Sequence, residues 1–337
     1  MKKFSWFLLT ILMLCSGCAA NPNSVMENGV SRAEASKESV GVETAPADQT
    51  QGNIEKILSS TPEEIKKQYS TENTIINIDA KVMVPKVEQI YTGKIKWLET
   101  ADTDAILQKI VSEDQSGQPE DNYSLSIAGE TPGGFGYENH AINEMYTENV
   151  EPAESEKPEI SMTPQKAVDA VEDLMDRMGV GEYSAESPHL QINHGGERDG
   201  AGLYRLWVTP KIYGVPLYLD IYKTGGFAVN GQAYVTDEGV GLVTGQICVE
   251  AYDAEKVQTI ISLEQAMDVL QQSLDLYVSG KPDNKVQTIA LRYLTKVTED
   301  GPVFVPCWCF EYEKMDLSVE NEGQDICINA VTGQIEE

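Results

Sequence analysis

The chain has 337 residues, of which 54 are acidic and 25 are basic, so its formal net charge is -29. A surface this negative repels phosphate, which argues against a nucleic-acid partner and against charge-driven adhesion to an anionic lipid surface. The hydrophobic fraction of 41% is enough to build buried cores. The length suggests two or three domains.

The first eighteen residues resemble the signal of a bacterial lipoprotein. Residues 1–3 are a basic start, residues 4–14 are apolar, and Ser16-Gly17-Cys18 follows. The apolar run is too short for a mature transmembrane helix, so we expect a signal peptide over 1–17 that is cleaved before Cys18. The resemblance implies a diacylglycerol on the Cys18 thiol, with fatty acyl chains such as palmitate, and an anchor on the outer face of the cytoplasmic membrane. The alternative is an ordinary signal peptide, and Cys15 stands where the lipoprotein motif usually has leucine.

Residues 18–53 predict a flexible tether that begins at the lipidated cysteine. The segment is rich in Ser, Glu, Ala, Asn and Gln and has no aromatic residue. Such a composition cannot bury enough apolar surface to offset the entropy lost on ordering. We expect the tether to hold the folded part away from the lipid headgroups.

Residues 54–150 predict an N-terminal α+β domain. A hydroxyl cap, a proline and two acids over 61–64 favour the start of a short helix. Strands are expected over 74–84, 88–97 and 123–127, with a helix between them over 102–111. An acidic, proline-containing segment over 148–157 predicts a domain boundary, and the alternative is a solvated crossing loop within one domain.

The rest of the chain predicts two repeat units, 159–255 and 256–337. Each unit opens with an amphipathic helix behind a hydroxyl N-cap, Thr163 in the first and Ser262 in the second. Val-Thr-Gly-Gln-Ile occurs at 243–247 and again at 331–335, and the segments 204–209 and 291–296 align at nearly the same spacing. We expect each unit to be a helix packed on an antiparallel meander that ends in a tight Thr-Gly turn, with extra residues in the first unit near 194–200. The predicted fold class is therefore α+β, with tandem duplicated units behind an N-terminal α+β domain.

This helix-and-meander pattern resembles the PepSY domain of bacterial secreted and membrane proteins. The resemblance rests on Thr163 with Ala167, Ser262 with Ala266, and the segments 308–312 and 329–335, although Asn329 and Gly241 stand where PepSY domains usually have Asp. Tandem copies behind a lipid anchor are similar to the YycH and YycI regulators of Gram-positive cell-wall signalling. The strand-like segment 78–82, together with such a C-terminal region, is similar to a combination found in clostridial lipoproteins. The resemblance implies a binding or regulatory role outside the cell, with a membrane kinase, a protease or a wall component as partner, and it carries over no catalytic residue.

Four cysteines fall in the part that is expected to fold: Cys248, Cys307, Cys309 and Cys327. Cys307 and Cys309 lie two apart on an expected strand, so both face one side of it and are poorly placed to pair with each other. Either could pair with Cys327 or Cys248 in an oxidising compartment, and buried free thiols are the alternative. The spacing is not that of a structural zinc site, and we expect no metal or other cofactor.

Aromatic residues gather on the expected strands of both repeat units. We expect Trp207 and Trp308 to fill the helix–sheet cores; the alternative is an exposed platform for a peptide or glycan, with Trp207, Tyr213 and Tyr218 as its candidate residues. An open sheet edge is another way to bind a peptide.

The sequence has no zinc-protease, serine-hydrolase or phosphate-loop motif. These features favour a non-enzymatic binding or regulatory lipoprotein; the alternatives are an extracytoplasmic hydrolase that acts through carboxylates and a structural envelope protein.

Overall fold

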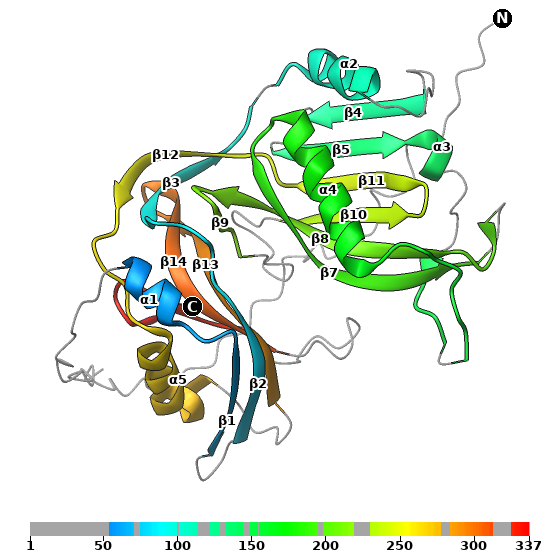
Figure 1. Ribbon diagram of the computed structural model, residues 1–337. Helices are drawn as coiled ribbons and strands as arrows, with labels where there is room; N and C mark the ends of the chain where they lie inside the picture. The colour runs from blue at the N-terminus through cyan, green and yellow to red at the C-terminus, as the bar shows by residue number, and fades with distance from the viewer. Residues whose placement is uncertain are drawn as a thin grey trace, which may run out of the picture. The chain divides into compact units, whose positions relative to one another are not determined.

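The computed structural model describes residues 54–70, 75–99, 101–113, 122–127, 133–143, 149–153, 155–194, 198–218, 230–277, 284–312 and 325–336. The predicted signal peptide, the tether and Cys18 lie outside these ranges. The described residues belong to one compact unit that combines helices with two mostly antiparallel sheets, so the predicted α+β class is confirmed (Figure 1).

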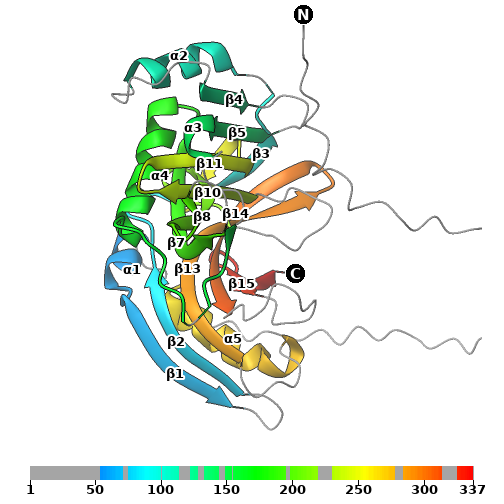
Figure 2. The ribbon, with the colours of Figure 1, turned by 90° about the vertical axis from the view of Figure 1, so that its right-hand side faces the viewer.

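Sheet A collects strands from both ends of the chain. Its main path runs β1-β2-β13-β14-β15-β16, and β3 joins β12 to β14 at the side of that path. β2 and β13 pair in parallel, and the other pairs in this sheet are antiparallel (Figure 2). The strands are β1 (Glu64–Ser70), β2 (Ile75–Met83), β3 (Tyr91–Trp97), β12 (Val249–Lys256), β13 (Asn284–Thr298), β14 (Gly301–Tyr312), β15 (Ile326–Asn329) and β16 (Ile335–Glu336).

Sheet B collects strands from the middle of the chain. Its order is β4-β5-β11-β10-β8-β7-β6, with the short β9 beside β8. The strands are β4 (Tyr123–Ile127), β5 (Gly134–Asn139), β6 (Asn149–Val150), β7 (Glu182–Asn193), β8 (Gly202–Ile212), β9 (Val215–Pro216), β10 (Asn230–Thr236) and β11 (Gly239–Gln246).

The helices are α1 (Ile54–Ser60), α2 (Thr103–Glu113), α3 (His140–Asn143), α4 (Pro164–Met178) and α5 (Leu263–Tyr277). Thr163 caps α4, and Gly179 ends it in the left-handed region at φ 68°. Ser262, the predicted N-cap of α5, forms a capping box with Gln265: the Ser262 N–H donates to the Gln265 amide oxygen at 2.8 Å, and the Gln265 N–H donates to Ser262 Oγ at 3.2 Å. Of the helices that the structure describes, none combines the length and the hydropathy that a membrane crossing needs.

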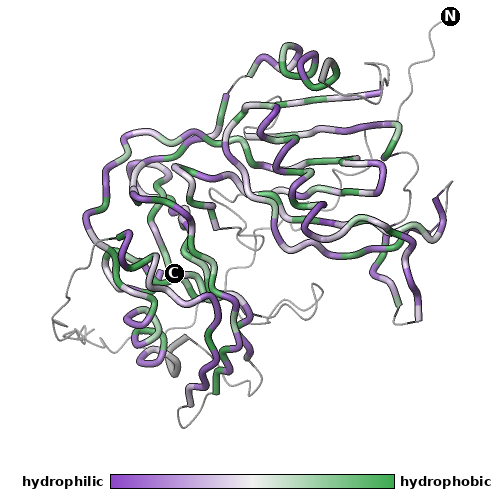
Figure 3. The backbone as a smooth tube through the Cα atoms, in the orientation of Figure 1, coloured by the Kyte–Doolittle hydropathy of each residue, from purple (hydrophilic) through white to green (hydrophobic). Residues whose placement is uncertain are grey.

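Each long helix buries one apolar stripe against its sheet. Ala167, Val171, Leu174, Met175 and Met178 of α4 are buried, as are Ala266, Met267 and Leu270 of α5. Along the strands, hydrophobic and hydrophilic residues alternate in several places (Figure 3). Trp308 is fully buried in this core, as predicted, and its Nε1–H donates to the carbonyl of Ile261 at 3.1 Å.

The two repeat units share one topology, but the repeated pentapeptide is not part of it. In each unit a helix precedes four strands that neighbour one another in order, β7-β8-β10-β11 and β13-β14-β15-β16. The first Val-Thr-Gly-Gln-Ile runs through the end of β11, where Thr244 pairs with Gln232, whereas the second forms the turn between β15 and β16, with Gly333 at φ 71°. The predicted equivalence of the two pentapeptides is therefore wrong. The alignment of 204–209 with 291–296 is also wrong, because it matches the second strand of one unit, β8, with the first strand of the other, β13.

The N-terminal residues also differ from the prediction. The strands of 54–150 divide between the two sheets: β1, β2 and β3 pair within sheet A, whereas β4, β5 and β6 pair within sheet B. The acidic 148–157 segment joins strands of one sheet, since β6 pairs with β7. The helix predicted to start at Thr61 is wrong: the helix α1 ends just before it, at Ser60, and the strand β1 follows at Glu64. Pro62 prevents continuation of α1, and Thr61 Oγ1 donates back to the carbonyl of Ile57 at 2.8 Å.

Candidate functional site

The face of sheet B that is turned away from α4 carries polar and aromatic side chains. On β8, Leu206 and Val208 are buried in the core, so Arg205 and Trp207, which alternate with them, lie on the other face. Cross-strand partners share a face. The strand register therefore defines this surface, the open face of sheet B, by the residues Glu186, His189, Arg205, Trp207, Gln232, Tyr234, Leu242 and Thr244.

Trp207 and Arg205 form the centre of the open face. The Arg205 guanidinium carbon lies 4.9 Å from the centroid of the Trp207 ring, which is a cation–π contact. The Arg205 Nε atom is buried and has no hydrogen-bond partner within the described part of the chain. The prediction that Trp207 fills the helix–sheet core is wrong, because the positions of β8 that face α4 are occupied by Leu206 and Val208.

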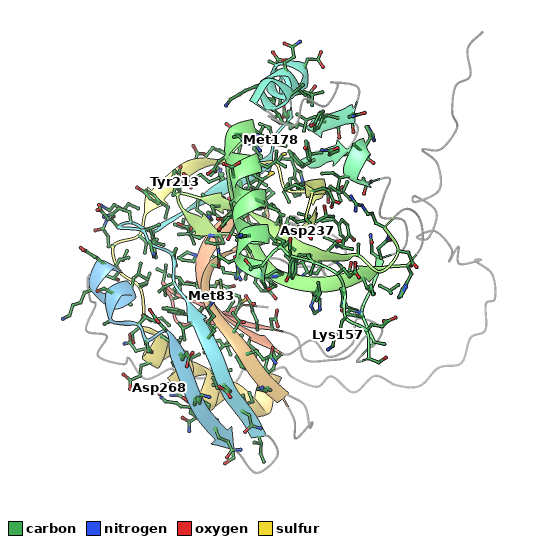
Figure 4. All side chains as sticks on the ribbon, turned by 45° about the vertical axis from the view of Figure 1, so that its right-hand side comes forward. Met83, Lys157, Met178, Tyr213, Asp237 and Asp268 are labelled. Atoms are coloured by element: carbon green, nitrogen blue, oxygen red, sulfur yellow. The ribbon has the colours of Figure 1, made fainter. Side chains whose placement is uncertain are left out.

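Tyr213 and Tyr218 do not join Trp207 in one platform. Tyr213 follows β8 in a turn at φ 50°, is 47% exposed and packs against Tyr91, with the ring centroids 4.4 Å apart and the rings tilted by 40°. Figure 4 labels this residue and Asp237, which lie at opposite ends of the paired strands β8 and β10. Tyr218 instead contacts sheet A: its N–H donates to the carbonyl of Tyr293 at 2.8 Å, and its hydroxyl donates to Asp325.

A buried ion cluster joins the open face to sheet A. Arg292 of β13 is 5% exposed. Its Nη1 and Nη2 donate to the two carboxylate oxygens of Glu186 at 3.0 and 2.6 Å, and its Nε donates to Glu311 Oε1 at 2.8 Å. A bidentate pair of this kind fixes direction as well as distance. Glu186 belongs to sheet B, so the contact ties the two sheets together.

A β-bulge positions Glu186 for this contact. The register of β7 against β8 shifts between Glu186 and His189, and Ser187 within the bulge has φ 52°, which a non-glycine residue seldom adopts. Ser184 Oγ donates to Glu186 Oε1 at 3.1 Å, which further fixes that carboxylate.

The two carboxylates of the cluster have opposite pKa shifts. Burial acts to raise the pKa of Glu186, but the charge and hydrogen bonds of Arg292 outweigh it and hold that pKa below its usual range. Burial raises the pKa of Glu311, and Arg292 opposes this rise only in part. Paired carboxylates with separated pKa values are a pattern of acid–base sites. Here, however, the guanidinium fills the space between them with three hydrogen bonds, so the geometry favours a structural role over the hydrolase alternative.

Three of the four cysteines lie on the face of sheet A that is opposite to the face carrying Trp308. Cys307 and Cys309 of β14 and Cys327 of β15 are buried together with Leu294, and Tyr218 packs against this cluster. Cys248 lies elsewhere, with its Sγ 4.0 Å from the hydroxyl of Tyr183, and burial raises its pKa to about 11. In the chain segments that the structure describes, no three side chains of His, Cys, Asp or Glu are arranged so that they could hold a metal ion.

An open pocket of about 370 Å³ lies beside Asp237, at the end of β10, and next to the chain that leads into α4. Its polar groups bind one another: Asp237 accepts hydrogen bonds from the N–H groups of Ser161 and Met162, and Arg198 pairs with Glu238. These contacts stabilise the chain before α4.

Comparison with known proteins gives a fold but no family. No protein-family model matches the chain, and no curated protein does. The crystal structure of an uncharacterized protein from Eubacterium rectale ATCC 33656 has a TM-score of 0.57 at 13% identity, covering 84% of this chain and 98% of that one, which shows a shared fold.

Two further solved structures are less similar. They are the C-terminal domain of YpeB from Bacillus megaterium (TM-score 0.33, 13% identity, 71% of this chain and 96% of that one) and YycH from Bacillus subtilis (TM-score 0.37, 10% identity, 80% of this chain and 58% of that one). These two TM-scores are too low to indicate a shared fold.

Proposed function

We propose that this protein is a membrane-anchored extracytoplasmic lipoprotein that binds another protein at the cell surface and catalyses no reaction. The anchor is the diacylglycerol expected on Cys18, and the predicted tether over 18–53 gives the folded part its reach. The resemblance of the sequence to PepSY domains and to the YycH and YycI regulators supports a regulatory role for the bound partner.

The observation that carries the proposal is the composition of the open face of sheet B. Trp207, Arg205 and Tyr234 lie on neighbouring strands, since Arg205 is the register partner of Tyr234 and stacks on Trp207. Trp, Arg and Tyr are the residue types most enriched in the energetic centres of protein–protein interfaces.

The surrounding residues fit the rim of such an interface. Gln232 is half-buried, and His189 and Thr244 are exposed. An interface of this kind has a partly apolar centre and a polar, wet rim. A protein partner with basic or neutral groups also suits a chain whose net charge is -29.

The test is a comparison of photo-crosslinking from two positions of the full-length lipoprotein in living cells. One photoreactive residue replaces Thr244, which is exposed and lies on the open face. The matched control replaces Asp169, which is exposed on α4. We expect a defined crosslinked protein from position 244 and not from position 169. Equal products from both positions, or none from position 244, would contradict the proposal.

A further inference from the structure

We propose that Cys309 and Cys327 form a cross-strand disulfide in the exported protein. The two residues are direct register partners on the antiparallel strands β14 and β15, and their Sγ atoms lie 3.0 Å apart. Directly opposed residues on such strands have Cβ atoms about 4.5–5.5 Å apart, close to the about 3.5–4.5 Å of a disulfide. Bond formation therefore needs the sulfurs to approach by only about 1 Å.

The register selects this pair over the other pairings that the sequence allows. Cys307 lies on the same face of β14, but its partner on β15 is Asn329 and not Cys327. The Asn329 side chain is engaged with Glu336 and with the N–H groups of Val331 and Thr332. Cys248 is in another cluster, beside Tyr183.

The oxidation is a thiol–disulfide exchange with a disulfide-bonded co-reactant, either a small molecule or a protein. One thiolate attacks the co-reactant's disulfide and releases one of its thiols, and the second cysteine then displaces the other thiol. Two protein S–H bonds are lost, one S–S bond forms, and the co-reactant is reduced to two thiols. Burial raises the pKa of the Cys309 thiol well above its usual value, so its thiolate becomes scarce once β15 has packed. The exchange therefore belongs to folding after export.

The bond would stabilise the contact of Tyr218 with sheet A. Asp325, two residues before Cys327, accepts the Tyr218 hydroxyl and also the N–H of Tyr312 at 3.0 Å. Tyr218 itself packs on the cysteine cluster and bonds to β13. Fixing β15 to β14 thus fixes the acceptor that holds the segment after β9 against sheet A.

Peptide mapping of the full chain, exported into an oxidising compartment, tests the pairing. Trypsin cleaves at Lys314, between Cys309 and Cys327, so the disulfide joins two peptides that reduction separates. The variants Cys307→Ser and Cys309→Ser are matched controls, because trypsin has no site between positions 307 and 309. We expect the linked peptide from most wild-type and Cys307→Ser molecules and none from Cys309→Ser.

Two results would overturn the disulfide. One is that Cys309 and Cys327 are alkylated as free thiols in most wild-type molecules unfolded without reductant. The other is that the link persists in Cys309→Ser and disappears in Cys307→Ser. As a second readout that needs no variant, reductant should lower the melting temperature of the wild-type protein by several degrees.

Discussion

Replacing Arg292 by Met should destabilise the protein more than any other single charge removal in the described part of the chain. The substitution keeps the volume of the side chain and removes its charge. It leaves Glu186 and Glu311, which accept three hydrogen bonds at 2.6–3.0 Å from the guanidinium, without that partner. Removing one member of a buried ion cluster costs about 3–5 kcal/mol, because the remaining charge stays desolvated.

The structure indicates the lower end of this range. The side chains of Glu186 and Glu311 are 15% and 24% exposed, so water relieves part of the penalty. We expect a loss of about 3 kcal/mol at neutral pH, which is roughly a hundredfold in the unfolding equilibrium. The matched control is Arg177→Met, which breaks an exposed i,i+4 pair with Asp173 and should cost about 0.5 kcal/mol or less.

Urea unfolding followed by fluorescence and circular dichroism measures both variants. Without Arg292, burial raises the pKa of both carboxyls, so the folded state binds more protons than the unfolded state above about pH 4.5. The stability deficit of Arg292→Met should therefore shrink as the pH falls from 7 toward 5. Adding Glu186→Gln and Glu311→Gln should recover part of the loss. A deficit no larger than that of Arg177→Met, or one that grows at pH 5, would refute the reasoning.

Three further predictions concern stability and are measured by the same unfolding curves. Gly133→Ala should cost several kcal/mol, since an added Cβ would lie 2.1 Å from the Trp97 ring, whereas Gly179→Ala, at nearly the same φ but with open space around it, should cost about 1 kcal/mol. Trp308→Ala should cost about 3–5 kcal/mol because the ring is fully buried, whereas Trp207→Ala should cost about 1 kcal/mol. Tyr218→Phe should cost about 1–2 kcal/mol through the lost hydrogen bond to Asp325.

Each of these three predictions has a result that contradicts it. Equal losses for Gly133→Ala and Gly179→Ala would mean that the left-handed backbone, and not the Trp97 contact, sets the cost. A larger loss of stability for Trp207→Ala than for Trp308→Ala would show that the Trp207 side chain is part of the core. Tyr218→Phe with unchanged stability would show that the Asp325 contact contributes nothing measurable.

Local signals in the sequence predicted local structure well. The caps and apolar stripes of α4 and α5 predicted both helices, and the alternation over 123–127 predicted β4 with the bounds that the structure has. Pairing between distant segments was not predictable, because a strand pattern carries no information about its partner. The strand β5 is not predictable from its sequence, because its alternating glycines, Gly134 and Gly136, are unfavourable in a strand interior. The repeated pentapeptide was misleading, because identity of sequence did not imply identity of place.

The candidate site was predictable only in part. Trp207, Tyr213 and Tyr218 were identified as aromatic candidates, but whether they share a surface depends on the register of β8 and on the turn after it. Arg292 interrupts the apolar run 289–294 of β13, and a buried charge needs a partner, so the sequence held a signal for the ion cluster. It did not identify Glu186, which lies 106 residues away and reaches Arg292 through a β-bulge.

The most direct test of the proposed recognition role is the yield of crosslinked partner from position 244 in cells, measured with and without Trp207→Ala. Trp207 supplies the aromatic surface on which Arg205 stacks, and loss of such an interface centre costs at least about 2 kcal/mol, or roughly thirtyfold in affinity. We predict that the crosslinked product falls at least tenfold while the amount of folded lipoprotein on the membrane stays the same. An unchanged yield at equal protein level would contradict the account.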